Sequence, residues 1–175
     1  DNFDMASILH RECDKLVERH PHIYGDVVVS DESDVKRNWE AIKLRTGKKS
    51  VLAGVPKSLP AVVKAYRMQE KTATVGFEWD DISQVRIKVE EEWGELDDAI
   101  KSEDAAQIER EFGDLLFAMI NYARYLNLDP ESALERTNKE FKRRFEYIEA
   151  HSTKPLEDMT LDEMDALWEE AKRTR

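Results

Sequence analysis

The sequence predicts an all-α protein, and three observations predict that fold. Only 6 glycines and 5 prolines occur among 175 residues, and they gather at a few places along the chain. Between those places, apolar residues recur at intervals of three and four, which is the spacing of one helix face. The one strand-like run, residues 27–29, is too short to build a sheet. We therefore expect a bundle of helices.

The expected helices cover residues 3–19, 34–45, 58–74, 81–101, 104–127, 130–150 and 160–173. The first helix stops at a segment that contains proline and glycine, residues 20–25. Loops are expected at residues 47–60 and 76–80. Capping residues open four of the helices in order: Ser58 with Pro60, Asp104 with Gln107, Asp129 with Pro130, and Thr160 with Glu163.

Composition excludes several classes of protein. Charged residues make up 37% of the chain and hydrophobic residues 41%, and no apolar run approaches the roughly 18 residues of a membrane-spanning helix. The formal net charge of −11 argues against general nucleic-acid binding, which needs a basic surface. We expect neither a nucleic-acid nor a membrane partner. An anionic substrate would be repelled unless cations intervene.

Cys13 is the only cysteine, which excludes an intramolecular disulfide framework and a zinc site built from several cysteines. A reduced, cytoplasmic setting is therefore expected.

The most informative local pattern is a pair of acidic motifs on two consecutive helices. Glu92 and Glu95 lie three residues apart along one edge of an apolar stripe, together with Lys88. Glu111 and Asp114 repeat this layout on the next helix. A short loop joins the two helices, so an antiparallel hairpin is expected, in which the acidic edges can face each other across small alanines.

Carboxylates that gather beside packed apolar surface need a cation or a proton. Two like charges about 4 Å apart repel by about 4 kcal/mol at an effective dielectric near 20. Oxygen ligands alone suit Mg²⁺ or Mn²⁺ better than zinc. A solvated acidic face is the alternative interpretation, and the spacing by itself names no reaction.

These motifs resemble the signature of the MazG-type nucleoside triphosphate pyrophosphohydrolases. The ordered set that carries the resemblance is Glu91-Glu92-x-x-Glu95, Glu111-x-x-Asp114, Val75-Gly76-Phe77-x-Trp79, the segment 113–118, Asn121-x-Ala123-Arg124, Asn138, Phe141, Arg143-Arg144-Phe145 and Trp168-x-x-x-Lys172. The resemblance spans nearly the whole chain. It implies an all-α fold that dimerises into a helical bundle, and Mg²⁺-dependent hydrolysis of NTP or dNTP to the monophosphate and pyrophosphate by attack of water at the α-phosphorus.

The resemblance also implies a role for each matching residue. Glu92, Glu95, Glu111 and Asp114 would hold Mg²⁺, for which Mn²⁺ is a possible substitute. Glu91 and Glu92 would be catalytic, with Glu91 as an outer acid or a base that orients water. The nucleotide contacts would be Lys88, Glu91, Arg144, Trp168 and Lys172, with further phosphate contacts at Gln107, Arg110, Lys139 and Glu140. Trp168 could stack on a base.

The chain departs from the family pattern in two places. Glu140 stands where the family usually has a lysine, which replaces a phosphate-binding cation by an acid. Full-length members with two repeats also carry another acidic motif ahead of a segment like residues 1–43. We therefore expect residues 1–57 to be the tail of an incomplete first repeat and a linker, with Lys15, Arg19, Trp39 and Lys43 as its relics. Residues 58–175 would form the pyrophosphohydrolase domain.

Two other functions stay open on the sequence. One is a narrower pyrophosphohydrolase that acts on dUTP or phosphoribosyl-ATP. The other is a non-catalytic helical module for nucleotide sensing or dimerisation.

Overall fold

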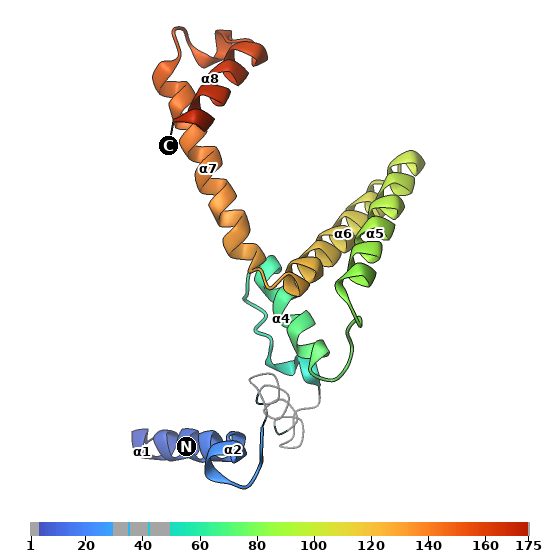
Figure 1. The fold of residues 1–175 in the computed structure, drawn as a ribbon, viewed down its shortest axis with the longest axis vertical. Helices are drawn as coiled ribbons and strands as arrows, with labels where there is room; N and C mark the ends of the chain where they lie inside the picture. The colour runs from blue at the N-terminus through green and yellow to red at the C-terminus, as the bar shows by residue number, and fades with distance from the viewer. Residues whose placement is uncertain (1–3, 30–34, 36–41, 43–49, 175) are drawn as a thin grey trace. The chain divides into compact units, whose positions relative to one another are not determined.

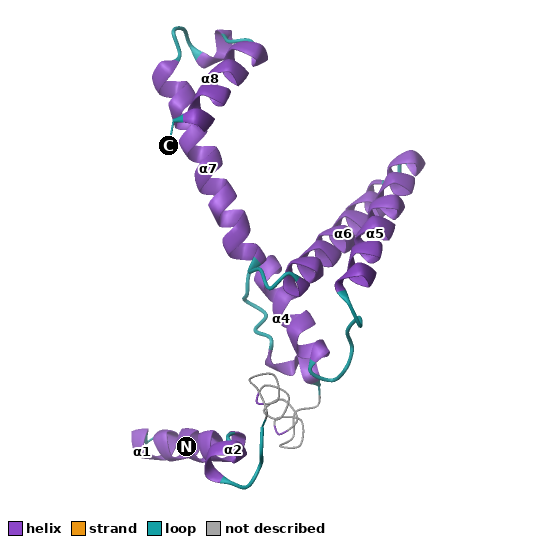
Figure 2. Ribbon diagram, viewed as in Figure 1, coloured by secondary structure: helices purple, strands orange, loops and turns teal. Residues whose placement is uncertain are grey.

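The computed structural model describes residues 4–29, 35, 42 and 50–174, and helices dominate this part of the chain (Figures 1 and 2). The elements are α1 (Met5–Arg19), α2 (Pro21–Tyr24), η1 (Val51–Gly54), α4 (Ala61–Ala73), α5 (Ile82–Ser102), α6 (Ala105–Tyr125), α7 (Pro130–His151), η2 (Leu156–Asp158) and α8 (Leu161–Arg173). No strand occurs among the described residues, and the all-α prediction is confirmed. None of these helices is both long enough and apolar enough to cross a membrane.

Three of the four predicted capping positions cap helices in the structure, whereas α4 begins at Ala61 after Pro60 with no side-chain cap, so Ser58 does not cap it. Asp104 accepts hydrogen bonds from the backbone N–H groups of Ala106 and Gln107, and Asp129 caps α7 in the same way. Thr160 and Glu163 form a reciprocal capping box at the start of α8. The Gln107 side chain does not complete such a box, because its Oε1 lies 3.5 Å from Ser102 Oγ instead.

Two predicted features need comment. The helix expected at 34–45 lies outside the described residues except for Val35 and Ile42, which are both helical. Residues 51–54 form a 3-10 helix inside the expected loop.

The chain divides into two compact units, residues 1–127 and 128–175. The predicted boundary between residues 57 and 58 separates sequence repeats, whereas these units are defined by their compactness. The repeat boundary therefore stays a prediction. In the first unit, α5 and α6 run side by side as a hairpin, and α4 packs against α6 (Figure 1). In the second unit, α7 packs against α8, and Arg143 of α7 donates to the carbonyl oxygens of Ala171 and Thr174, each at 3.0 Å.

The hairpin buries its small and acidic edge rather than its largest side chains. Ala99 of α5 and Ala118 of α6 are buried, whereas Trp93 is 57% exposed. Small side chains let two helix backbones approach closely, and that edge therefore becomes the contact. Trp79, in the loop before α5, is also 44% exposed in the single chain.

Candidate active site

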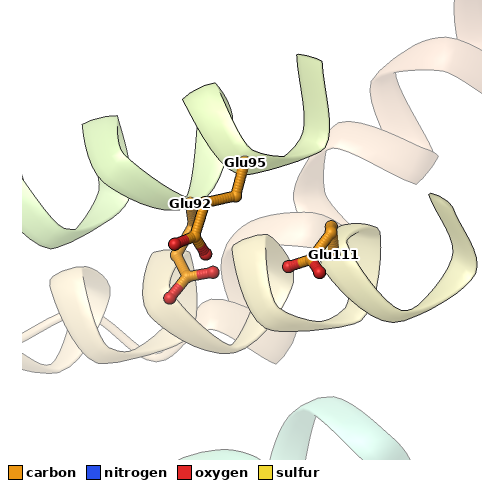
Figure 3. A group of neighbouring side chains, drawn as sticks. All are labelled: Glu92, Glu95 and Glu111. Atoms are coloured by element: carbon orange, nitrogen blue, oxygen red, sulfur yellow. The ribbon is translucent and has the colours of Figure 1, made fainter. Parts of the chain in front are cut away.

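Three carboxylates from the two helices of the hairpin converge on one point (Figure 3). Glu92 and Glu95 project from neighbouring positions on one face of α5, and Glu111 projects from α6. One oxygen from each lies within 4.8 Å of the others. Glu92 and Glu111 are buried, with 7% and 8% exposure, whereas Glu95 is exposed.

A cation accompanies each buried carboxylate. Lys88 lies one helical turn before Glu91 and Glu92, and its Nζ is 2.8 Å from Glu92 Oε1 and 2.6 Å from Glu91 Oε1. Arg110 Nη2 lies 2.8 Å from Glu111 Oε1. Burying an unpaired carboxylate is costly, so these partners make the acidic cluster compatible with folding.

The charges in the cluster shift two pKa values. The carboxylates of Glu91 and then Glu92 raise the pKa of Lys88 well above its usual value. Partial desolvation of the exposed Glu95 carboxylate by its surroundings, followed by the negative charge of Glu92, raises the pKa of Glu95. The site thus holds more negative charge than its internal cations balance.

The donor chemistry fits a hard divalent cation. All three converging atoms are carboxylate oxygens, and they come from rigid helices rather than loops. Mg²⁺ and Mn²⁺ prefer such ligands, whereas zinc sites generally include nitrogen or sulfur. A small protein ligand set is typical of Mg²⁺, which usually keeps several waters and binds substrate phosphates as well.

The structure places the other residues predicted on the hairpin close to this cluster or at its edge. Asp114 is not one of the three converging acids, but it lines a cavity together with Lys88 and Glu92. Arg110 pairs with Glu111, whereas Gln107 contacts Ser102 near the start of α6.

The remaining predicted nucleotide contacts belong to the second unit and gather partly around Trp168. The Arg144 guanidinium lies 5.3 Å from the centroid of the Trp168 ring, and the Phe141 ring is at the same distance. Lys172, one turn after Trp168, pairs with Glu169. Lys139 lies 3.5 Å from Glu135.

Glu140, the departure from the family pattern, is itself paired. It lies 3.0 Å from Arg143 and 3.3 Å from Arg144 Nε. The contact with Arg144 lacks hydrogen-bond geometry, because the buried Nε has no hydrogen-bond partner among the described residues. Glu140 thus neutralises one of the cations predicted to bind phosphate.

The cavity contains residues to which the sequence assigned no role. It has a volume of about 440 Å³ and extends from Lys88, Glu92 and Asp114 to α4, the loop at residues 76–80 and the end of α6. Gln69, Phe77, Trp79 and Asn121 belong to its lining. The sequence could have indicated Gln69 as a polar residue on the apolar face of α4. Spacing alone does not reveal how deeply such a residue is buried.

Contacts from α6 hold the 76–80 loop in place. Arg124 Nη1 lies 3.2 Å from Glu78 Oε2, and the Tyr125 hydroxyl donates to the carbonyl oxygen of Trp79 at 2.6 Å. Gly76 has a φ of +82°, in the left-handed region that other residues rarely adopt. The loop therefore has a defined path beside the acidic cluster.

Known proteins resemble this chain over the acidic hairpin and also over nearly its whole length. A family model described as the MazG nucleotide pyrophosphohydrolase domain matches residues 82–148, a range that begins with α5 and ends within α7. The nucleoside triphosphate pyrophosphohydrolase/pyrophosphatase MazG of Thermotoga maritima is 38% identical over 176 residues, which cover 97% of this chain and 66% of that protein.

Two further relatives match over 180 residues, or 98% of this chain. The nucleoside triphosphate pyrophosphohydrolase of Escherichia coli K12 is 37% identical, with 68% of its length covered. Protein YabN of Bacillus subtilis 168 is 44% identical, with 37% of its length covered. The chain thus spans about two thirds of the length of the Thermotoga and Escherichia relatives.

Proposed function

The chain belongs to the MazG family of nucleotide pyrophosphohydrolases, and from that premise we propose that it hydrolyses nucleoside triphosphates to the monophosphate and pyrophosphate. The observation that carries the proposal is the convergence of Glu92, Glu95 and Glu111 within the segment that matches the family. Both ribo- and deoxyribonucleotides are included as substrates.

The carboxylates would hold Mg²⁺, with Mn²⁺ as a substitute. Glu92, Glu95 and Glu111 support this assignment by their geometry, and Asp114 by its place in the same cavity. When bound, the metal supplies positive charge that neutralises the triphosphate and lowers the pKa of bound water.

The chain's own residues would position the reactants around that charge. Glu91 lies on the same turn as Glu92, and we assign it to orienting the water that attacks the α-phosphorus. Lys88, which holds both Glu91 and Glu92, exchanges one of these partners for a phosphate oxygen when substrate binds. Its compact ammonium group suits contact with a phosphate as a point charge.

Residues of the second unit would supply further nucleotide contacts. Arg144 and Lys172 are assigned to the phosphates, and Trp168 to an aromatic contact with the nucleotide. The proximity of Arg144 to the Trp168 ring supports a shared role for this pair. Gln107, Arg110, Lys139 and Glu140 would be secondary phosphate contacts.

We also propose that the chain acts as a homodimer in the cytoplasm. The hairpin leaves an apolar face uncovered, including Ile100, Phe112 and Leu116, which are 52%, 52% and 46% exposed. A second copy that packs there would complete a helical bundle. The free, exposed Cys13 suits a reducing compartment.

A product assay in ¹⁸O-labelled water tests the proposed reaction. With Mg²⁺ and ATP, GTP, dCTP or dUTP, we expect pyrophosphate and a monophosphate that carries the label, because water attacks the α-phosphorus. Orthophosphate release, or a labelled pyrophosphate, would contradict the reaction. Turnover of dUTP alone, or of phosphoribosyl-ATP alone when it is added to the panel, would indicate the narrower enzyme, and nucleotide binding without any product would indicate a sensor.

A further inference from the structure

Arg143 of α7 binds the last turn of α8. Its Nη1 donates to the carbonyl oxygen of Thr174 and its Nη2 to that of Ala171, each at 3.0 Å. The last four carbonyl groups of a helix lack backbone partners within the helix, and they form the negative end of its dipole. A guanidinium group suits this position, because it carries a positive charge and several N–H donors in a fixed plane. Arg143 therefore caps α8 from outside the helix.

The guanidinium group of Arg143 is fully used in contacts within the protein. Glu140, one turn earlier on α7, accepts from its Nε and from its Nη2, both at 3.0 Å. All three nitrogens of Arg143 are thus hydrogen-bonded, and one of their acceptors belongs to Ala171, which is 0% exposed. Neighbouring Arg144 differs, because its guanidinium lies over the Trp168 ring. Of the two arginines, Arg144 is the one suited to contact a ligand, and Arg143 is suited to hold α8.

Lys172 lies in the turn that Arg143 holds. It is the last residue but one of α8, and its ammonium group pairs with Glu169 of the same helix, so this pair does not tie it to α7. Trp168, one turn earlier, has a contact of its own with α7, because its ring lies 5.3 Å from the Phe141 ring. Helix ends fray where their groups lack partners. The placement of Lys172 therefore depends on the bonds that Arg143 makes.

We propose that Arg143 is a positioning residue, which holds the last turn of α8 against α7 so that Lys172 binds a phosphate of the substrate. Arg143 touches no substrate in this arrangement and acts through Lys172. A cation that is already fixed in place loses less conformational entropy on binding than one on a fraying turn. The inference rests on the proposed hydrolysis of nucleoside triphosphates and on the phosphate contact assigned to Lys172.

Steady-state kinetics of Arg143→Met give the first test. Methionine keeps an unbranched side chain but removes the donors to α8. We expect KM for ATP to rise about fivefold, with kcat within about twofold of its wild-type value, because the acidic cluster is unchanged. A merely structural role would give the opposite pattern, since unfolded molecules lower the apparent kcat and leave KM as it is. An unchanged KM would overturn the proposal.

Lys142→Met is the matched control. Lys142 is the neighbouring cation of α7, its side chain is 76% exposed, and it pairs with Glu146 of the same helix rather than with α8. The control variant should keep the wild-type KM. A rise in KM as large as that of Arg143→Met would show that the loss of any α7 cation has this effect, and it would overturn the specific role of Arg143.

A double-substitution cycle shows whether Arg143 acts through Lys172. The measurement is the Kd of α,β-methylene-ATP with Mg²⁺, in which carbon replaces the oxygen between the α- and β-phosphorus atoms. Arg143→Met should weaken binding about fivefold in the wild-type background and less than about twofold in a Lys172→Gln background. The full loss in both backgrounds would show that the two residues act independently, which would overturn the proposal.

A second variant covers the case in which Arg143→Met fails to fold. Arg143→Lys keeps the charge and one donor group but lacks the planar fork that reaches both carbonyl oxygens, so Kd should rise about twofold. If only this variant folds, an unchanged Kd overturns the proposal.

The outcomes separate the positioning role from the proposed function. Wild-type protein that releases no pyrophosphate from any NTP, but shows the expected pattern of Kd values, would overturn the hydrolysis and support the role of Arg143. A Lys172→Gln variant that binds the analogue as tightly as wild type would contradict the phosphate contact of Lys172 and, with it, this inference.

Discussion

At the scale of single residues, Glu92 is a buried, charged side chain located in the acidic cluster. It is 7% exposed, contacts Lys88, and contributes one of the three converging oxygens. A buried carboxylate with one internal cation is tolerated in the fold, and the remaining charge of the cluster is available to attract a metal. Its neighbours Glu91 and Glu95 are more exposed, so they can respond to substrate and metal with less cost in packing.

Substitution of Glu92 should separate metal binding from folding. Glu92→Gln keeps the shape of the side chain but removes its charge, so Mn²⁺ affinity and pyrophosphate release should fall by about a hundredfold or more. Isothermal titration with Mn²⁺ and circular dichroism melts measure the two properties separately. Glu90→Gln is the control, because Glu90 lies on the same helix but pairs with Arg86 outside the cluster. Near-wild-type turnover in Glu92→Gln would contradict the assignment.

Glu140 provides a second test at this scale. It pairs with Arg143 and Arg144, so Glu140→Lys both adds a cation and frees Arg144 from an acid. We expect KM for NTP to fall about two- to fivefold, in line with the modest strength of exposed charge pairs. Glu140→Gln, which only removes the acid, should give a smaller decrease. An unchanged or higher KM in the lysine variant would show that the departure does not weaken phosphate binding.

At the scale of elements, capping and local ion pairs determine where the helices begin. Glu163 accepts from the backbone N–H of Thr160 at 2.7 Å, and Lys154 Nζ lies 2.8 Å from it. Lys154, followed by the backbone of Thr160, lowers the pKa of Glu163 to about 2 from an ordinary value of 4.5. The turn at residues 152–160 is thereby tied to the start of α8.

This shift predicts a pH dependence. A carboxyl whose pKa is lower in the folded state stabilises the fold above its unfolded pKa, and the contribution is lost as the pH falls toward its folded pKa. Thermal melts should therefore show Glu163→Gln less stable than wild type at about pH 7, with a difference that shrinks between about pH 4.5 and pH 2. Glu157→Gln, in the same connection, is the control. A difference in Tm that stays constant across this range would contradict the role of Glu163.

At the scale of the whole molecule, the exposed apolar face of the hairpin is the feature that the single chain leaves unexplained. Leu116 and Met119 of α6 are 46% and 49% exposed, and they follow the exposed Phe112 at helical spacing. This face is apolar, whereas the buried edge of the hairpin carries carboxylates. Contiguous apolar surface of this kind usually marks an interface.

Sedimentation velocity tests the proposed homodimer. The wild-type protein should sediment as a species of twice the chain mass of 20.4 kDa. Leu116→Glu should sediment as a monomer, because the dimer interface would then bury an unpaired carboxylate. Val28→Glu, at a position that is 92% exposed in a loop, should keep the wild-type mass. A wild-type monomer, or a dimer that survives Leu116→Glu, would refute this interface.

Local patterns in the sequence predict the long helices, several of their caps and the acids of the candidate site. Apolar periodicity predicts the long described helices but not the short α2 or the 3-10 helices, and residues such as Asp104, Asp129 and Thr160 mark where three of the long helices begin. The spacing of Glu92 and Glu95 places both on one side of α5, since a helix repeats every 3.6 residues. Local hydrogen bonding and a fixed helical period suffice for these predictions.

The rotation of each helix about its axis and the burial of particular polar groups depend on contacts between helices, which local patterns do not reveal. Periodicity indicated an apolar stripe on α5, but in the structure Trp93 of that stripe is 57% exposed, whereas Ala99 and Ala118 are buried and Glu92 converges with Glu111. The burial of Gln69 likewise depends on α6, whose Phe117 carbonyl oxygen is 48 residues away along the chain. Spacing along one helix carries no information about its neighbour, because side-chain volumes at the contact determine their mutual rotation.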